Sequence, residues 1–83
     1  MNIMEDLEKY LLSEMAVDRD KKSLASDEDL LEQGIIDSLG IMKLILHMES
    51  AFGIKINDDD VVPENFQHLN SMVRFVQNKM QNR

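Results

Sequence analysis

The amino-acid sequence predicts an all-α fold, a four-helix bundle of three main helices and one short helix. Three separate segments of the 83-residue chain carry apolar residues at the three- and four-residue spacing of amphipathic helices. Ile54-Lys55-Ile56 alternates like a strand, but three residues without a partner strand are better explained as a connection. Because 83 residues is the size of one domain, we expect residues 1–83 to share a single core.

The first helix is expected at about residues 2–15. Asn2 followed by Glu5 resembles a capping box, in which side chains bond the free N–H groups of a helix start. The apolar residues that follow form one stripe: Ile3, Met4, Leu7, Leu11 and Met15, with Tyr10 beside them. This stripe is most simply a core face, so we assign it no chemistry.

A long polar and charged loop follows, over about residues 16–37. Loops of this length in compact domains are usually functional or carry a short helical turn. We expect three leucines to hold the loop against the bundle: Leu24, Leu30 and Leu31. Gly34 then offers a flexible turn, and burial of Ile35 and Ile36 after it would keep residue 38 at the surface.

The second helix is expected at about residues 38–52, because apolar periodicity starts there and Gly53 is a natural stop. One face should belong to the core: Ile41, Leu44, Ile45, Met48, Ala51 and Phe52. A second apolar stripe, on the other side of the helix, consists of Leu39, Met42 and Leu46. A helix with two apolar sides is either deeply buried or exposes one side for binding. We expect Met42 and Leu46 to be exposed, whereas the preceding loop is a serious candidate to cover Leu39.

The C-terminal third predicts a short helix at about residues 58–62 and a last helix at about residues 70–80. Three aspartates would begin the short helix, and it should stop or bend near Val62 because Pro63 cannot continue a helix interior. Asn70 or Ser71 is expected to cap the last helix. Its core positions are Leu69, Met72, Val73, Val76 and Met80.

Composition excludes several classes of function. The net charge of −7 argues against binding nucleic acid or an anionic membrane, since both require a basic face, and favours basic protein partners or solubility alone. No cysteine is present, which rules out disulfides and thiolate metal sites. No stretch approaches membrane-spanning length, and the N-terminus lacks a signal-peptide pattern, so we expect a cytoplasmic monomer without membrane insertion.

Ser38 is the candidate functional residue. Asp37 and Ser38 are both good N-cap types, and they stand immediately before the apolar periodicity. A serine at a helix start lies near unpaired N–H groups and the positive end of the helix dipole, which favour a phosphate. Spacing alone leaves a simpler alternative, in which Ser38 only caps the helix.

Residues 34–40, GIIDSLG, followed by IMKLILHMESAFGIKI, resemble the acyl and peptidyl carrier protein family. The Asp37-Ser38-Leu39 motif is short, but it follows a glycine and begins the second helix, mid-chain in a small acidic protein. The resemblance covers most of the chain. The segment Val61-Val62-Pro63-Glu64-Asn65-Phe66 is also similar to stand-alone, pathway-dedicated carriers.

The resemblance implies a 4'-phosphopantetheine arm on Ser38, installed from coenzyme A by a phosphopantetheinyl transferase, with Asp37 positioning the serine. The terminal thiol would hold acyl or aminoacyl cargo as a thioester. The implied partners are that transferase, an acyl- or aminoacyl-loading ligase and a downstream synthase or transferase.

The resemblance also implies that partner enzymes dock on the second helix, here at Leu39, Met42, Lys43 and Leu46. Lys43 stands where carriers of fatty acid synthesis usually have an acidic residue, and Glu49 is the only acid of this helix. The departure favours apolar recognition, and therefore a specialised lipid, peptide or polyketide pathway over housekeeping fatty acid synthesis.

Two other classes compete with this interpretation. A cofactor-free interaction module would dock its second helix in a partner's groove. A serine hydrolase would need a base and a nucleophile elbow, but Ile36 replaces the first glycine of G-x-S-x-G and His47 lies more than two turns from Ser38. No histidine pair has metal-ligand spacing, so we expect neither catalysis by this chain nor a bound metal.

Overall fold

The computed structural model describes residues 2–14 and 24–81, and within them every regular element is helical. Four α-helices and one 3-10 turn follow in chain order: α1 (Ile3–Glu14), α2 (Ser38–Phe52), the turn Asp58–Asp60, α3 (Pro63–Phe66) and α4 (Leu69–Gln81). The predicted all-α bundle of three main helices is confirmed. The predictions for Met15 and for the first part of the loop, up to residue 23, lie outside the described residues.

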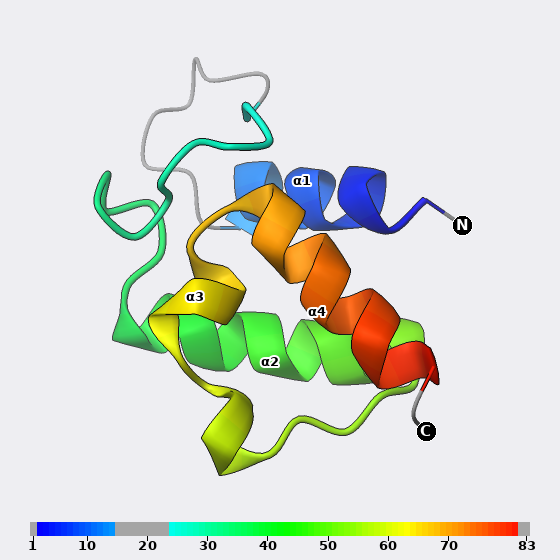
Figure 1. The fold of residues 1–83 in the computed structure, drawn as a ribbon. Coiled ribbons are helices and arrows are strands. Elements are labelled where there is room, and N and C mark those ends of the chain that lie inside the picture. The colour runs from blue at the N-terminus through cyan, green and yellow to red at the C-terminus, as the bar shows by residue number, and fades with distance from the viewer. Residues whose placement is uncertain (1, 15–23, 82–83) are drawn as a thin grey trace.

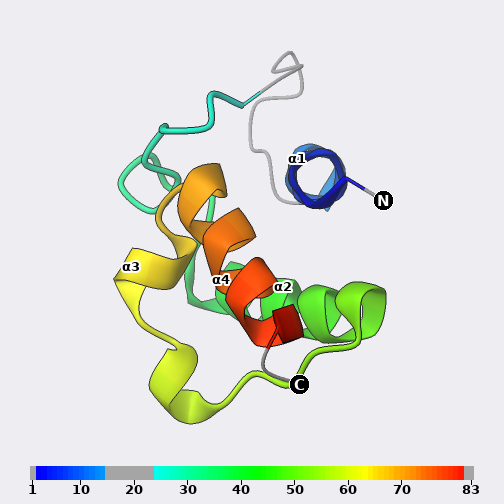
Figure 2. The ribbon, with the colours of Figure 1, turned by 45° about the vertical axis from the view of Figure 1, so that its right-hand side comes forward.

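The three main helices form a compact bundle in which α1 and α2 run in opposite directions (Figure 1). α4 crosses between them, and α3 stands at the end where α2 begins (Figures 1 and 2). Residue contacts agree with the antiparallel pairing of α1 and α2. His47 Nε2 lies 2.8 Å from Asp6 Oδ1, the Tyr10 hydroxyl donates to the carbonyl of Lys43 at 3.3 Å, and the Tyr10 and His47 rings stack with centroids 4.0 Å apart.

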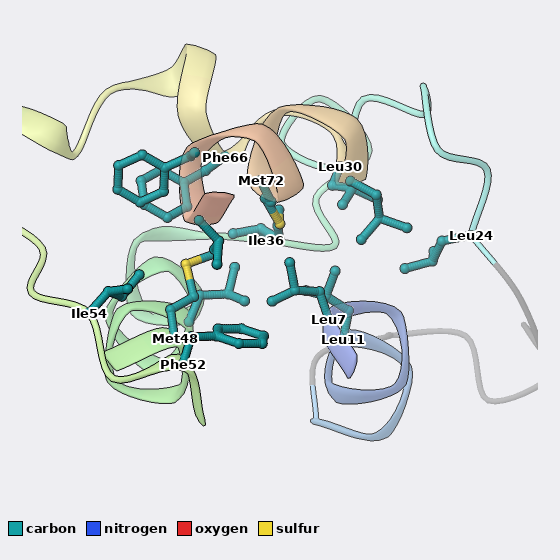
Figure 3. Close-up of a cluster of buried hydrophobic side chains, with 14 residues drawn as sticks. Leu7, Leu11, Leu24, Leu30, Ile36, Met48, Phe52, Ile54, Phe66 and Met72 are labelled. Carbon is teal, nitrogen blue, oxygen red and sulfur yellow. The ribbon is translucent and has the colours of Figure 1, made fainter. Parts of the chain in front are cut away.

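All three main helices and the connecting segments contribute to one apolar core. Leu7 and Leu11 of α1 face Met48 and Phe52 of α2 (Figure 3). Among the described residues, the buried hydrophobic side chains are Leu7, Leu11, Leu24, Leu30, Ile36, Leu44, Met48, Phe52, Ile54, Phe66, Leu69, Met72, Phe75 and Val76. Each such side chain contributes about 1.5–3 kcal/mol on full burial, so this cluster is the main stabilising element.

The core face predicted for α2 is confirmed. Leu44, Met48 and Phe52 are buried, and Ile41, Ile45 and Ala51 pack against them as partly buried neighbours. Gly53 ends the helix with a positive φ of 64°, and its N–H donates to the carbonyl of Glu49. Glycine adopts this left-handed conformation without the steric cost that a Cβ would add.

The described part of the long loop is held against α3 and α4. Leu24 and Leu30 are buried, as expected, and Leu31 is partly buried. The Leu30 N–H donates to the carbonyl of Gln67 at 2.9 Å, and the Gln67 side chain donates to Asp29 Oδ2 at 2.8 Å. The end of the loop, which leads into α2, therefore has a fixed support on the junction between α3 and α4.

The structure differs from the sequence-based prediction around Pro63. The expected short helix at about 58–62 is a 3-10 turn over Asp58–Asp60, and α3 begins at Pro63 instead of being ended by it. Proline suits the first position of a helix, because its missing N–H has no acceptor there and its φ is already helical. α4 likewise begins at Leu69, so the expected caps Asn70 and Ser71 lie inside its first turn.

Asp60 connects the 3-10 turn to the last turn of α4. Its carboxylate forms an ion pair with Lys79 and accepts from the N–H of Asn57 at 2.9 Å. The hydrogen bond with Lys79 is the main cause that lowers the pKa of Asp60, and the Asn57 N–H adds to it. The pKa of Asp29 is also lowered, mainly by the side-chain hydrogen bond from Gln67.

Both lowered pKa values imply stability that is present above the unfolded-state pKa of about 3.9 and is lost as the pH falls below it. We expect the Asp60→Asn variant to melt below wild type at neutral pH, and the two proteins to converge once the pH falls below the lowered pKa of Asp60, where the wild-type carboxylate is also protonated. Circular dichroism melts at neutral pH and through an acidic series measure this. Asp59→Asn, at an exposed neighbour, is the control and should melt like wild type. If Asp60→Asn lowered the melting temperature equally at neutral and at acidic pH, the ion pair with Lys79 would not be the cause of the lower stability.

Candidate functional site

Asp37 sets the first residue of α2. Its backbone is extended, with φ −114° and ψ −171°, and its Oδ1 accepts from the N–H of Gly40 at 2.7 Å. Its carbonyl accepts from the N–H of Ile41 at 2.9 Å. Asp37 is therefore the N-cap, and the alternative in which Ser38 is the cap is wrong. Ser38 is the first helical residue.

The Ser38 side chain is exposed and is not used for capping. Among the described residues, no hydrogen bond engages the N–H groups of Ser38 and Leu39, which are the first two of the helix. Unpaired N–H groups and the positive end of the helix dipole favour an anion beside the hydroxyl. The residues present thus fit a phosphate-bearing group on Ser38.

The segment before α2 is anchored two residues away from Ser38. The carbonyl of Leu30 accepts from the N–H groups of both Ile35 and Ile36, at 3.0 and 3.2 Å, and Ile36 is only 2% exposed. Gly34 makes the turn between these residues, with φ 76°, a conformation that other residues adopt at a cost. The expectation that buried isoleucine holds Ser38 at the surface is borne out by Ile36, whereas Ile35 is partly buried.

The hollow beside Ser38 is small. It measures about 170 Å³ and is lined by Glu14, Gly34, Ile35, Asp37, Leu39, Gly40 and Lys43. Cavities that enclose a small ligand usually measure about 300–1,000 Å³. A more open hollow of about 580 Å³ lies on α1, but charged side chains dominate its lining and it includes no residue of the motif. The geometry at Ser38 is suited to covalent attachment more than to enclosure of a free ligand.

Leu39, Met42, Lys43 and Leu46 form an exposed surface on α2, which we call the α2 strip. The three apolar side chains are 61%, 61% and 66% exposed, and Lys43 is also exposed. The expected exposure of Met42 and Leu46 is confirmed, and Leu39 is exposed as well. Glu49, the only acid of the helix, is partly buried and accepts from the N–H of Ile56 at 2.9 Å.

Both histidines make their hydrogen-bond contacts with residues other than Ser38. His47 pairs with Asp6, and His68 Nδ1 lies 3.4 Å from the hydroxyl of Ser71. Within residues 2–14 and 24–81, no three acidic or histidine side chains group as metal ligands would. No helix in that part of the chain has the length and apolar character needed to cross a membrane.

Comparisons with known proteins agree on one family. The family model described as "Phosphopantetheine attachment site" matches residues 3–76. The D-alanyl carrier protein of Streptococcus equi subsp. zooepidemicus (strain MGCS10565) is 35% identical over 51 residues, which are 61% of this chain and 65% of that protein. The D-alanyl carrier protein of Streptococcus uberis (strain ATCC BAA-854 / 0140J) is 38% identical over 50 residues, 60% of this chain and 63% of that protein.

The match to these relatives thus spans just under two thirds of their length, whereas the family model covers most of the present chain. The helical fold and the exposed serine at the start of α2 agree with that family. The chain therefore belongs to the phosphopantetheine attachment site family of carrier proteins, whose prosthetic group is 4'-phosphopantetheine.

Proposed function

We propose that this protein is a carrier that holds acyl or aminoacyl cargo through a phosphopantetheine arm on Ser38. The observation that carries the proposal is the exposed Ser38 hydroxyl at the first position of α2, outside the cap and beside unpaired N–H groups. The arm supplies the thiol that binds the cargo as a thioester, in a chain that has no cysteine of its own.

Each residue of the motif has a distinct part in this function. The Ser38 oxygen forms the new bond to phosphorus as adenosine 3',5'-bisphosphate leaves coenzyme A, and the serine proton passes to a base of the transferase. Asp37 is a positioning residue, because its bond to Gly40 determines where the helix begins. The N–H groups of Ser38 and Leu39 would stabilise the negative charge of the resulting phosphodiester.

D-alanine is the first candidate cargo. The relatives named above are D-alanyl carrier proteins, and the α2 strip carries a lysine and no carboxylate. Both features favour an aminoacyl carrier of a specialised pathway over a carrier of housekeeping fatty acid synthesis. The α2 strip would bind the enzymes that serve Ser38: the phosphopantetheinyl transferase, an aminoacyl-loading ligase and a downstream transferase or synthase.

Incubation with coenzyme A and a broad-specificity phosphopantetheinyl transferase should raise the intact mass of the wild type by one phosphopantetheinyl group. Ser38→Ala should keep its mass, because the attachment oxygen is gone, and Ser13→Ala, at an exposed serine of α1, should react like wild type. Mass spectrometry measures all three. An unmodified wild type beside a fully modified reference carrier would contradict the proposal and favour a cofactor-free interaction module.

Removal of the Asp37 cap should destabilise the protein and slow its modification. Asp37→Ala leaves the Gly40 N–H without its acceptor, which costs about 0.5–2 kcal/mol at an N-cap. Asp37→Asn retains an acceptor oxygen and should recover most of the stability. Urea unfolding gives the free energies, and the rate of mass gain gives the modification. A rate that falls equally in both variants would assign Asp37 a role of its charge beyond the cap.

The cargo is tested on the modified protein with an adenylate-forming ligase, ATP and a panel of D- and L-amino acids and fatty acids. We expect D-alanine to add to the protein, and hydroxylamine to remove it because it cleaves thioesters. Preferential loading of a fatty acid would reject the proposed cargo and leave the attachment at Ser38 intact.

A further inference from the structure

The α2 strip has one charged group, and that group is positive. Helical steps of 100° place Leu39, Met42, Lys43 and Leu46 within an arc of about 100° on the side away from the core. Within that arc Lys43 lies at one edge, four residues after Leu39, so its exposed side chain adds a positive charge beside the apolar side chains.

Lys43 lines the hollow beside Ser38 together with Glu14 of α1, but among the described residues no ion pair joins these two side chains. Among the described residues, Lys79 forms an ion pair with Asp60, His47 contacts Asp6, and no ion pair involves Lys43. The Asp37 carboxylate is bonded to the N–H of Gly40. Because Lys43 is exposed and forms no ion pair with the described residues, we take its ammonium group as accessible to a partner protein.

We propose that Lys43 determines which enzymes bind this carrier, by requiring a partner whose apolar groove carries an aspartate or glutamate opposite the ammonium group. The proposal rests on the carrier function proposed above and names the chemistry of the loading ligase's docking site: apolar pockets for Leu39, Met42 and Leu46, with one carboxylate beside the pocket for Leu39. A groove lined by arginine or lysine, which suits an acidic helix, would place like charges in contact.

The acidity of the whole chain does not reverse this requirement. The net charge of −7 attracts basic surfaces from a distance, but salt screens charges separated by more than about 8 Å at physiological ionic strength. At contact, the desolvated pair formed by Lys43 and its partner dominates, because the attraction between two charges rises as distance and local dielectric constant fall. Net charge thus influences the encounter, whereas Lys43 influences the choice of partner.

A second copy of this chain does not fit the same surface. A symmetric dimer around the α2 strip would bring each strip against its own equivalent, with Lys43 near Lys43 and two chains of charge −7 in contact. Charge complementarity therefore favours a different protein as the occupant.

The test compares loading of the modified protein by the adenylate-forming ligase that loads the wild type with D-alanine. Four variants are used: Lys43→Glu, Lys43→Met, Lys43→Arg and Lys55→Glu, the last at an exposed lysine outside α2. We expect Lys43→Glu to raise the KM of the ligase for the carrier about tenfold or more, with little change in kcat. Lys43→Met should raise this KM less, and Lys43→Arg should leave it at the wild-type value. Lys55→Glu should load like wild type.

Salt dependence separates a charge pair from a packing effect. Raising NaCl from about 50 to about 500 mM should increase KM for wild type but much less for Lys43→Met, which has no charge to screen. An unchanged or lower KM for Lys43→Glu would overturn the inference and indicate a basic or neutral groove. Because every variant is first checked for phosphopantetheine by mass, an unmodified wild type would instead refute the carrier function, and the inference with it.

Discussion

The place of Ser38 at the start of α2 depends on one hydrogen bond, from the Gly40 N–H to the Asp37 carboxylate. It fixes the first residue of α2, and each residue of a helix is rotated by about 100° from the one before it. Ser38 is therefore the first helical residue, whereas burial of Leu44, Met48 and Phe52 fixes how α2 is rotated about its axis. The cap and the core together determine which side chains of α2 are exposed.

α2 satisfies two requirements that usually belong to different helices. Its inner side buries Leu44, Met48 and Phe52, which ties it to α1 and α4, while its outer side leaves three large apolar side chains in water. Exposed apolar groups of this kind are a liability unless a partner covers them. Glu49 is partly buried and accepts a hydrogen bond from the Ile56 N–H, so Lys43 is the charged side chain that lies exposed on the outer side of α2.

Much of the fold could be predicted, because periodicity and capping are local properties. The limits of α2 and its core face follow from residues within a few turns of one another, and the motif at Ser38 is contiguous. The start of α3 could not be predicted, because a proline such as Pro63 can either end a helix or begin one. The extended backbone of Val62 in the structure shows that here it begins one. The contacts of Tyr10 and Asp6 with α2, and of Gln67 with the loop, join residues distant in sequence, and no local pattern indicates them.

Leu30 is the point at which two distant parts of the chain meet. Its N–H is bonded to Gln67, between α3 and α4, and its carbonyl is bonded to Ile35 and Ile36, which lead to the serine. The serine's position therefore depends on a junction more than 25 residues further along the chain. Substitutions at that junction offer evolution a way to shift Ser38 while the Asp-Ser-Leu motif stays unchanged.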